Sequence, residues 1–237
     1  MKKIFLFLLL SNFIFAQTPK ITKENPFFTI RGVVGIPKTT GSMMYRQSFS
    51  GIYEANLSLA FNLGKNFIGG VGYQNALFKN HKSFVFIKTG TGSVSYNTQL
   101  IQHGAFLRLG YDKFITEIAY INYSLNSGLL FCNYTGVVND TSLVNRPYGD
   151  VRFSAPYVQP EISFNFLAGE KQELSFSLLF SYTTMFYKFD PKAPRFNHFG
   201  DPTAIYTKGN RYFMNWINIG LGFNILIRGK SKAAAAG

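Results

Sequence analysis

After its first sixteen residues the chain lacks any apolar run long enough to form a transmembrane helix. Such a helix needs roughly 20 consecutive apolar residues, and from Gln17 onward polar residues or glycine interrupt every hydrophobic stretch. Charged residues are also scarce, at 15% of the 237 residues, against about 25% in an average soluble domain. The sequence therefore excludes transmembrane helices after the first sixteen residues, and its composition is atypical of a water-soluble domain.

Cysteine is nearly absent as well. The one cysteine, Cys132, cannot form an intramolecular disulfide, and we expect no thiolate metal site. No group of residues has metal-ligand spacing, and no glycine-rich phosphate loop or dinucleotide fingerprint is present. We therefore expect no cofactor and no metal, and we interpret Cys132 as a free thiol in or beside a loop.

Aromatic residues, by contrast, reach 17% of the chain, and the N-terminus has the features of an export signal. Met1–Lys3 is basic, Ile4–Leu10 is an unbroken apolar run, and Ala16 offers a small residue for cleavage. We predict a cleavable signal peptide and export to the outer membrane of a Gram-negative cell. The predicted organisation is a signal peptide at 1–16, a periplasmic segment at 17–26, a β-barrel at 27–228, and a tail with a cloning remnant at 229–237.

Apolar and polar residues alternate strictly in several segments. From Tyr53 to Leu63 every odd-numbered residue is apolar, whereas the even-numbered positions carry Glu, Asn, Ser, Ala and Asn. This period of two is typical of a strand with one apolar and one polar face. The pattern predicts eight strands, over residues 27–36, 51–63, 67–78, 98–111, 114–125, 157–167, 173–187 and 211–227.

The connections between these strands alternate in length. Gly64–Asn66, Tyr111–Lys113 and Ala168–Gln172 are predicted tight turns. The other four connections are long and rich in Gly, Pro, Asn and Lys; they cover residues 37–50, 79–97, 126–156 and 188–210. The predicted fold is therefore all-β: a closed up-and-down transmembrane β-barrel of eight antiparallel strands, with short periplasmic turns and long extracellular loops.

A soluble β-sandwich or a lipocalin-like barrel would alternate too. Such proteins expose their polar faces to water, where Lys and Glu are expected, whereas the polar faces here carry mainly Ser, Asn, Gly and Gln. Aromatic residues such as Phe27, Tyr53, Phe67, Tyr111 and Phe213 lie near predicted strand ends, where membrane barrels have interfacial girdles. Both observations favour the membrane barrel.

In this respect the chain resembles the small outer-membrane β-barrels of the OmpX and OmpA transmembrane-domain type. The resemblance covers residues 27–228 and depends on the architecture and on the apolar closing strand Ile217–Ile227. It implies the fold and the location of the protein rather than an activity.

The interior of an eight-stranded barrel is just wide enough for side chains to fill it, so we do not expect an open pore. The predicted interior charge cluster consists of Arg31, Glu54, Arg108, Glu117 and Glu161. Glu117 is placed inward because a charge that faces lipid is costly. We expect these charges to pair, to plug the lumen and to fix the strand register. A gate or a proton path is the alternative interpretation.

The predicted loops are basic, because Lys and Arg outnumber Asp in them. Such a belt would neutralise the phosphates of lipopolysaccharide. The loops also combine Arg with aromatic residues, a mixture enriched at protein interfaces. The candidate interaction residues are Arg46, Tyr148, Arg152, Arg195, Phe196 and Tyr206. The expected partners are outer-membrane lipid, lipopolysaccharide and other outer-membrane proteins or lipoproteins; the compartment excludes nucleic acid.

Two functions remain open at this point. The first is a non-enzymatic structural or accessory subunit of an outer-membrane complex for secretion, uptake or barrel assembly, acting through its loops and lipid-facing wall. The alternative is an outer-leaflet lipid A-modifying enzyme, a Ser/His acyl hydrolase or transferase. Such an enzyme needs a histidine near its serine, because a hydroxyl nucleophile needs a base. His81-Lys82-Ser83 resembles the His-x-Ser of lipid A deacylases, but it lies in a predicted loop and no Asn-Ala follows the serine.

Overall fold

In a computed structural model of the chain, the structure describes most of the predicted barrel. The described residues are 26–41, 45–46, 49–80, 84–89, 92–139, 146–169, 172–188 and 213–227, with 84–89, 92–97, 136–139 and 146–150 described by their backbone alone. The predicted signal peptide and tail lie outside these ranges. No helix in the described part of the chain is long and apolar enough to cross a membrane.

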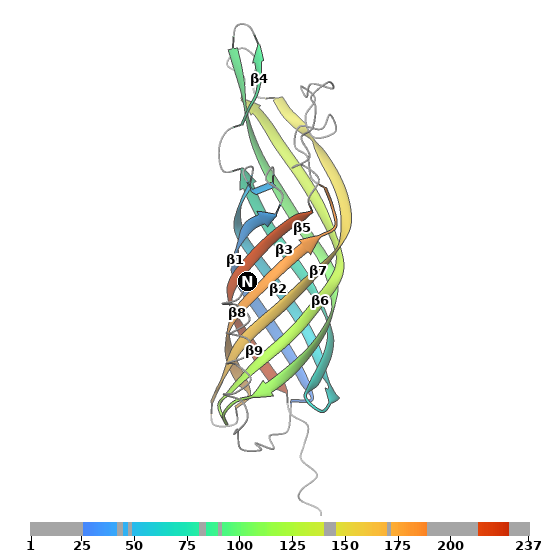
Figure 1. Cartoon of the computed structure of the whole chain (residues 1–237), viewed down its shortest axis with the longest axis vertical. Coiled ribbons are helices and arrows are strands. Elements are labelled where there is room, and N and C mark those ends of the chain that lie inside the picture. The colour runs from blue at the N-terminus through green and yellow to red at the C-terminus, as the bar shows by residue number, and fades with distance from the viewer. Residues whose placement is uncertain are drawn as a thin grey trace, which may run out of the picture.

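Eight strands pair with a neighbour on each side and form one closed ring (Figure 1). The ring runs β1-β2-β3-β5-β6-β7-β8-β9 and back to β1, with every pair antiparallel. The strands are β1 (Phe28–Gly41), β2 (Phe49–Gly64), β3 (Phe67–Asn80), β5 (Gly92–Phe114), β6 (Ala119–Asn139), β7 (Arg146–Ala168), β8 (Leu174–Met185) and β9 (Met214–Ile227). The short β4 (Phe84–Thr89) pairs with the start of β5 and is not part of the ring. The predicted fold class is confirmed.

Short turns join the strands at one end of the barrel. Between β2 and β3, Lys65 and Asn66 have φ values of 49° and 69°, which is the backbone of a type I′ hairpin turn. The prediction of a turn at Tyr111–Lys113 is wrong, because β5 continues to Phe114 and the turn comprises residues 115–118. The amide of Ile115 donates to the carbonyl of Ala119 across this turn, at 3.0 Å.

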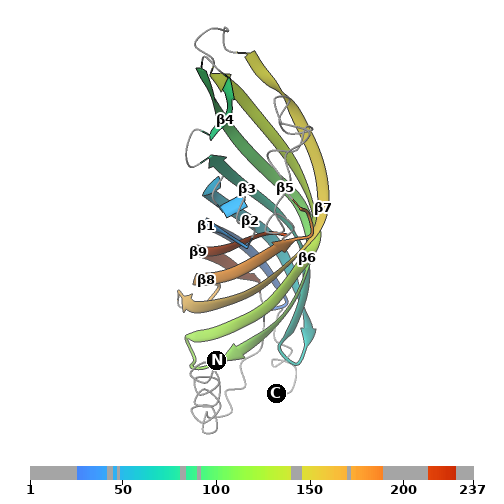
Figure 2. The same ribbon diagram turned by 45° about the horizontal axis from the view of Figure 1, so that its top comes forward.

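At the opposite end three strands are much longer than predicted. Most of the predicted loop 126–156 belongs to β6 and β7, and the predicted loop 79–97 contains β4 and the start of β5. Figure 2 shows β5, β6 and β7 rising past the ends of the other strands as a projecting sheet. Pro156 indicated a loop, but its carbonyl accepts from the amide of Phe186. Its ring nitrogen therefore faces the end of β8, so the N–H that proline lacks removes no hydrogen bond between β7 and β6.

The outer wall of the ring is apolar. Alternate side chains point outward, and Leu107 and Leu221 in the wall are 67% and 71% exposed. Aromatic pairs lie near the short-turn end, with ring centroids 5.1 Å apart for Phe67 and Tyr111. A protein in water would bury such a continuous surface, whereas an apolar band flanked by aromatic residues matches hydrocarbon and its interfaces.

Candidate functional site in the barrel interior

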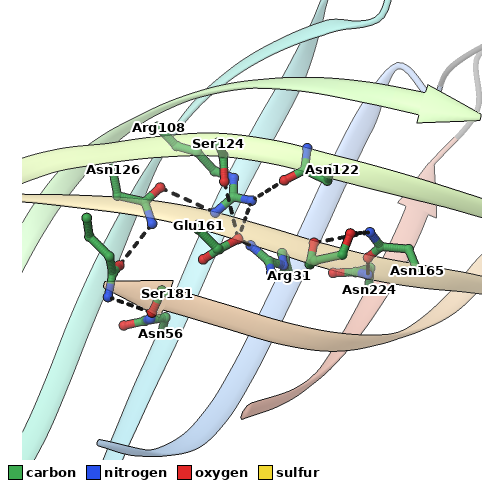
Figure 3. A network of polar contacts seen from close by, with 12 residues as sticks. Arg31, Asn56, Arg108, Asn122, Ser124, Asn126, Glu161, Asn165, Ser181 and Asn224 are labelled. Carbon is green, nitrogen blue, oxygen red and sulfur yellow. Dashed lines mark hydrogen bonds and ion pairs between the residues drawn. The ribbon is translucent and has the colours of Figure 1, made fainter. Parts of the chain in front are cut away.

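The half of the interior nearest the short turns is organised around one carboxylate. Arg31 on β1, Arg108 on β5 and Glu161 on β7 all point inward and are almost fully buried. Both guanidinium groups donate to Oε1 of Glu161, from Arg31 Nη1 and, at 2.8 Å, from Arg108 Nη2 (Figure 3). Because these strands lie on different sides of the ring, the two ion pairs connect β1 and β5 to β7 across the interior of the barrel.

Neutral side chains surround this triad and extend it. Arg108 donates to Asn122 at 2.8 Å and to Asn126 at 3.3 Å, and Asn122 donates to Asp112 at 2.6 Å. Asp112 supplies a second negative charge, so the two arginines and two carboxylates balance. A remaining space of about 20 Å³ borders Arg31 and Asp112, which is room for about one water molecule.

The network continues toward the long-loop end as far as Glu54. Asn126 donates to Gln159 at 3.0 Å, and Gln159 donates to Glu54 at 2.7 Å. Glu54 is fully buried and also accepts from Asn56 at 3.1 Å and from the indole nitrogen of Trp216 at 2.6 Å. All three donors are neutral. Glu54 is therefore held by dipoles rather than by an ion pair.

Beyond Glu54 the interior becomes apolar, which the sequence patterns do not reveal. The buried side chains here form a cluster in which Phe78 packs edge-on to Trp216, with ring centroids 5.4 Å apart. Tyr45 packs 5.7 Å from Phe78, between centroids, and comes from the connection between β1 and β2. The cluster consists of Tyr45, Phe49, Ala76, Phe78, Leu100, Phe106, Leu130, Cys132, Tyr134, Ala155, Tyr157, Met185, Met214 and Trp216. We call it the upper core.

Four of the five residues predicted for the interior charge cluster lie in the lumen, and one does not. Arg31, Arg108 and Glu161 are in direct contact, and Glu54 is joined to them through Gln159 and Asn126. Glu117 lies exposed in the turn between β5 and β6, so its placement in the interior is corrected. Its position in that turn keeps its charge out of the lipid without bringing it into the lumen.

The residues predicted for loop interactions and for catalysis are only partly within the described chain. Arg46 and Arg152 are exposed, and Tyr148 belongs to β7, opposite Gly136 on β6. Arg195, Phe196 and Tyr206 lie outside the described residues, as do His81, Ser83 and His198. His103 stacks on Phe131 with ring centroids 6.0 Å apart. Within the described ranges, no three His, Cys, Asp or Glu side chains form a group that could hold a metal ion.

Removing the indole donor to Glu54 is expected to destabilise the barrel. Trp216→Phe keeps an aromatic ring beside Phe78 but leaves one carboxylate oxygen of Glu54 without its 2.6 Å hydrogen bond. A hydrogen bond to a charged group contributes about 1.5–3 kcal/mol, and we expect a loss of that size in the free energy of unfolding. Urea titration followed by circular dichroism measures it. Ile217→Val, on the neighbouring outward position, is the control, and an equal loss in both variants would contradict the assigned role of the indole.

No protein-family model matches the chain, and no curated protein sequence matches it significantly. Several solved structures are similar to it. Neisserial surface protein A (NspA) is 11% identical, over 86% of this chain and 100% of that one, with a TM-score of 0.44. The N-terminal β-barrel domain of Pseudomonas aeruginosa OprF is 11% identical, over 85% and 100% of the two chains, with a TM-score of 0.39.

A major outer membrane protein from Thermus thermophilus is 12% identical, over 84% of this chain and 97% of that one, with a TM-score of 0.49. The strand register of the chain itself defines it as a closed eight-stranded barrel, the architecture of the small outer-membrane barrels that its sequence resembles.

Proposed function

We propose that this chain is an integral outer-membrane barrel with a plugged lumen, and that it acts as a structural or accessory subunit of an outer-membrane protein complex. The observation that carries the proposal is the projecting sheet, in which β5, β6 and β7 continue beyond the ring. The apolar outer wall supports the membrane location. The wall also offers a second surface for neighbouring membrane proteins.

The filled interior favours a structural role over transport. Charged and amide side chains occupy the half near the short turns, and the upper core occupies the other half. The space of about 20 Å³ beside Arg31 is far too small for a solute. These side chains support the proposal that a barrel of eight strands with such an interior acts through its surfaces rather than through its lumen.

The projecting sheet has the features of a protein-binding edge. The recorded pairing between β7 and β8 begins at Tyr157, and in the described chain no strand pairs with that side of β7 over residues 146–155. An exposed strand edge is a template for pairing with another chain. Arg152 is exposed on this segment, and Phe153 stacks on Tyr187 with ring centroids 4.1 Å apart.

The same end of the barrel is basic. The exposed cations in the described residues near the long connections are Lys38, Arg46, Lys79, Arg152 and Lys188. Cations at this level would contact the phosphates of lipopolysaccharide. Lipopolysaccharide is therefore the proposed lipid partner, and it would hold the projecting sheet at a fixed height above the membrane.

Photo-cross-linking at Arg152 tests the proposed protein interface. A photoreactive amino acid at position 152 is expected to form an adduct of one discrete mass in intact cells. The matched control is the same amino acid at Lys65, which is exposed in the turn at the other end of the barrel. Equal adducts at both positions would contradict the proposal. So would the absence of adducts together with altered lipid A acylation in a strain that lacks the protein, an outcome that favours the enzymatic alternative.

A further inference from the structure

A trough of about 630 Å³ crosses the outer wall of the barrel. The ridge on its short-turn side is a row of outward side chains that lie opposite one another in neighbouring strands. The row consists of Phe67 on β3, Tyr111 on β5, Tyr123 on β6, Ile162 on β7 and Phe180 on β8. Each of these side chains is at least 36% exposed. The trough therefore opens toward the lipid rather than toward the lumen.

A second row of outward side chains forms the opposite ridge, further from the short turns. It consists of Leu109 on β5, Leu125 on β6 and Pro160 on β7, which are opposite one another in the register. The row between the two ridges contains Gly110, Ser124 and Glu161. Glycine has no side chain, and Ser124 and Glu161 point into the lumen. The floor of the trough is therefore backbone, and its walls are two rows of mainly apolar side chains.

The trough rises from the short-turn end toward the middle of the wall. Phe67 is the first residue of β3, whereas Phe180 lies well inside β8, which begins at Leu174. Crossing from β3 to β8 at about 4.8 Å per strand gives a length of about 19 Å. Because strands in such barrels tilt by about 45°, a row perpendicular to them climbs about 13 Å, close to half of a hydrocarbon core of about 30 Å. The trough thus spans the leaflet on the side of the short turns.

Two lysines lie at the β3 end of the trough. Lys65 is exposed in the turn between β2 and β3, and Lys113 follows Tyr111 by two positions on β5, on the outward face. The described carboxylates at this end of the wall, Glu117 and Glu173, belong to the connections after β5 and β7. The outward-facing charges that the described chain places beside β3 are therefore positive, which suits an anionic lipid headgroup.

We propose that the trough binds one acyl chain of an anionic glycerophospholipid of the periplasmic leaflet, with the lipid phosphate beside Lys65. Lipid tails are as apolar as the wall, so the trough contributes shape and packing rather than a hydrophobic driving force. Selectivity comes from the attraction between the lysines and the phosphate. The site requires the membrane location of the barrel and not its proposed role as a subunit of a complex.

Contact with unselected membrane lipids is the competing explanation of an exposed apolar trough. It predicts several bound lipids of equal affinity and no preference for a headgroup. A second copy of the chain seated in the trough predicts a dimer that retains no lipid. The number of bound lipids and their headgroup therefore separate the three explanations.

Native mass spectrometry of the whole delipidated protein in detergent, titrated with phosphatidylglycerol, tests the site. We expect one phosphatidylglycerol per chain, bound about fivefold more tightly than phosphatidylcholine with the same acyl chains. Equal affinity for the two lipids, uptake of several lipids without a first tight one, or a lipid-free dimer would each overturn the proposal.

Variants separate the headgroup from the acyl chain. Lys65→Gln is expected to abolish the preference for phosphatidylglycerol, whereas Lys79→Gln, an exposed lysine at the other end of the barrel, should preserve it. The double variant Leu125→Ala, Ile162→Ala lowers both ridges and should weaken binding of both lipids about threefold or more. Its matched control is Val34→Ala, Leu221→Ala, an exposed pair on β1 and β9 outside the trough.

The heat-dependent shift in gel mobility reports that each variant is folded. If the folded Lys65 variant kept the headgroup preference, or if the two double variants bound lipid equally well, the trough would not be the binding site and the proposal would be wrong.

Discussion

Replacing Glu161 by Gln is expected to lower the free energy of unfolding of the barrel by about 3–5 kcal/mol. Glu161 Oε1 accepts from both Arg31 and Arg108, and all three residues are almost fully buried. The substitution preserves the size of the side chain but leaves two buried guanidinium groups without their shared counter-charge. Urea unfolding in lipid vesicles, followed by the fluorescence of the single tryptophan, Trp216, measures the loss.

Two further variants test whether the loss of stability comes from the unpaired buried charges or from the Glu-to-Gln change itself. Glu117→Gln makes the same change in the exposed turn, and we expect an effect within about 0.5 kcal/mol. Replacing Arg31, Arg108, Glu161 and Asp112 together by Met, Met, Leu and Asn removes both buried cations and both carboxylates that balance them, and should recover most of the lost stability. If Glu161→Gln were as stable as Glu117→Gln, the triad would not hold the strands together.

Leu221→Arg is expected to destabilise the folded barrel in a bilayer by about 2–4 kcal/mol. Leu221 lies in the middle of β9, points outward and is 71% exposed. Its register partners are Val34 and Leu178, which also lie in the middle of their strands. The charge would therefore sit near the centre of the hydrocarbon. The unfolding free energy in vesicles of defined lipid composition gives the measurement.

The same substitution near the end of a strand supplies the control. Leu63 is 64% exposed and lies next to the turn between β2 and β3, at the expected level of the headgroups. Leu63→Arg should cost only about 0–1 kcal/mol. Because the two leucines have similar exposure, a soluble barrel would tolerate both changes alike. Equal effects at positions 63 and 221 would thus contradict a transmembrane wall.

Much of the ring could be predicted from residue periodicity. The alternation from Tyr53 to Leu63 places Glu54 inward, and Glu54 is fully buried in the structure. The turn after Gly64 is equally clear from the sequence, because Gly64 and Asn66 are residue types that favour turns, although Lys65 also takes a positive φ of 49°. Where one face of a strand meets lipid and the other meets a polar lumen, the inward and outward residues predicted from the sequence match those in the structure.

The misplaced turn between β5 and β6 has a physical cause. Tyr111-Asp112-Lys113 has turn-like composition, but Asp112 points into the lumen and accepts from Asn122. The buried network, which joins residues from different strands, outweighs the local preference. Once β5 is extended to Phe114, Glu117 falls in the turn and no longer has to be placed inside.

The upper core could not be predicted because it breaks the polar-inside pattern. Leu130, Cys132 and Tyr134 point inward on β6, so apolar residues occupy both faces of this strand and the alternation disappears. Gly128 and Pro156 added loop signals in the same region. The contact between the sulfur atoms of Cys132 and Met185 joins residues of β6 and β8 that are far apart in the sequence, and residue patterns in a single sequence do not show such contacts.

The pairing of β1 with β9 also governs how the chain can fold. Phe28 lies opposite Ile227, so the seam joins the first and last strands of the barrel. Until β9 has been made and delivered, β1 has one side without a partner, and unpaired backbone groups are not tolerated in hydrocarbon. Because contacts so distant along the chain form slowly, we expect closure to be a late step of folding. A chain truncated before β9 would remain open along β1 and β8, and cells that make it should accumulate it outside the membrane, where proteases can reach it.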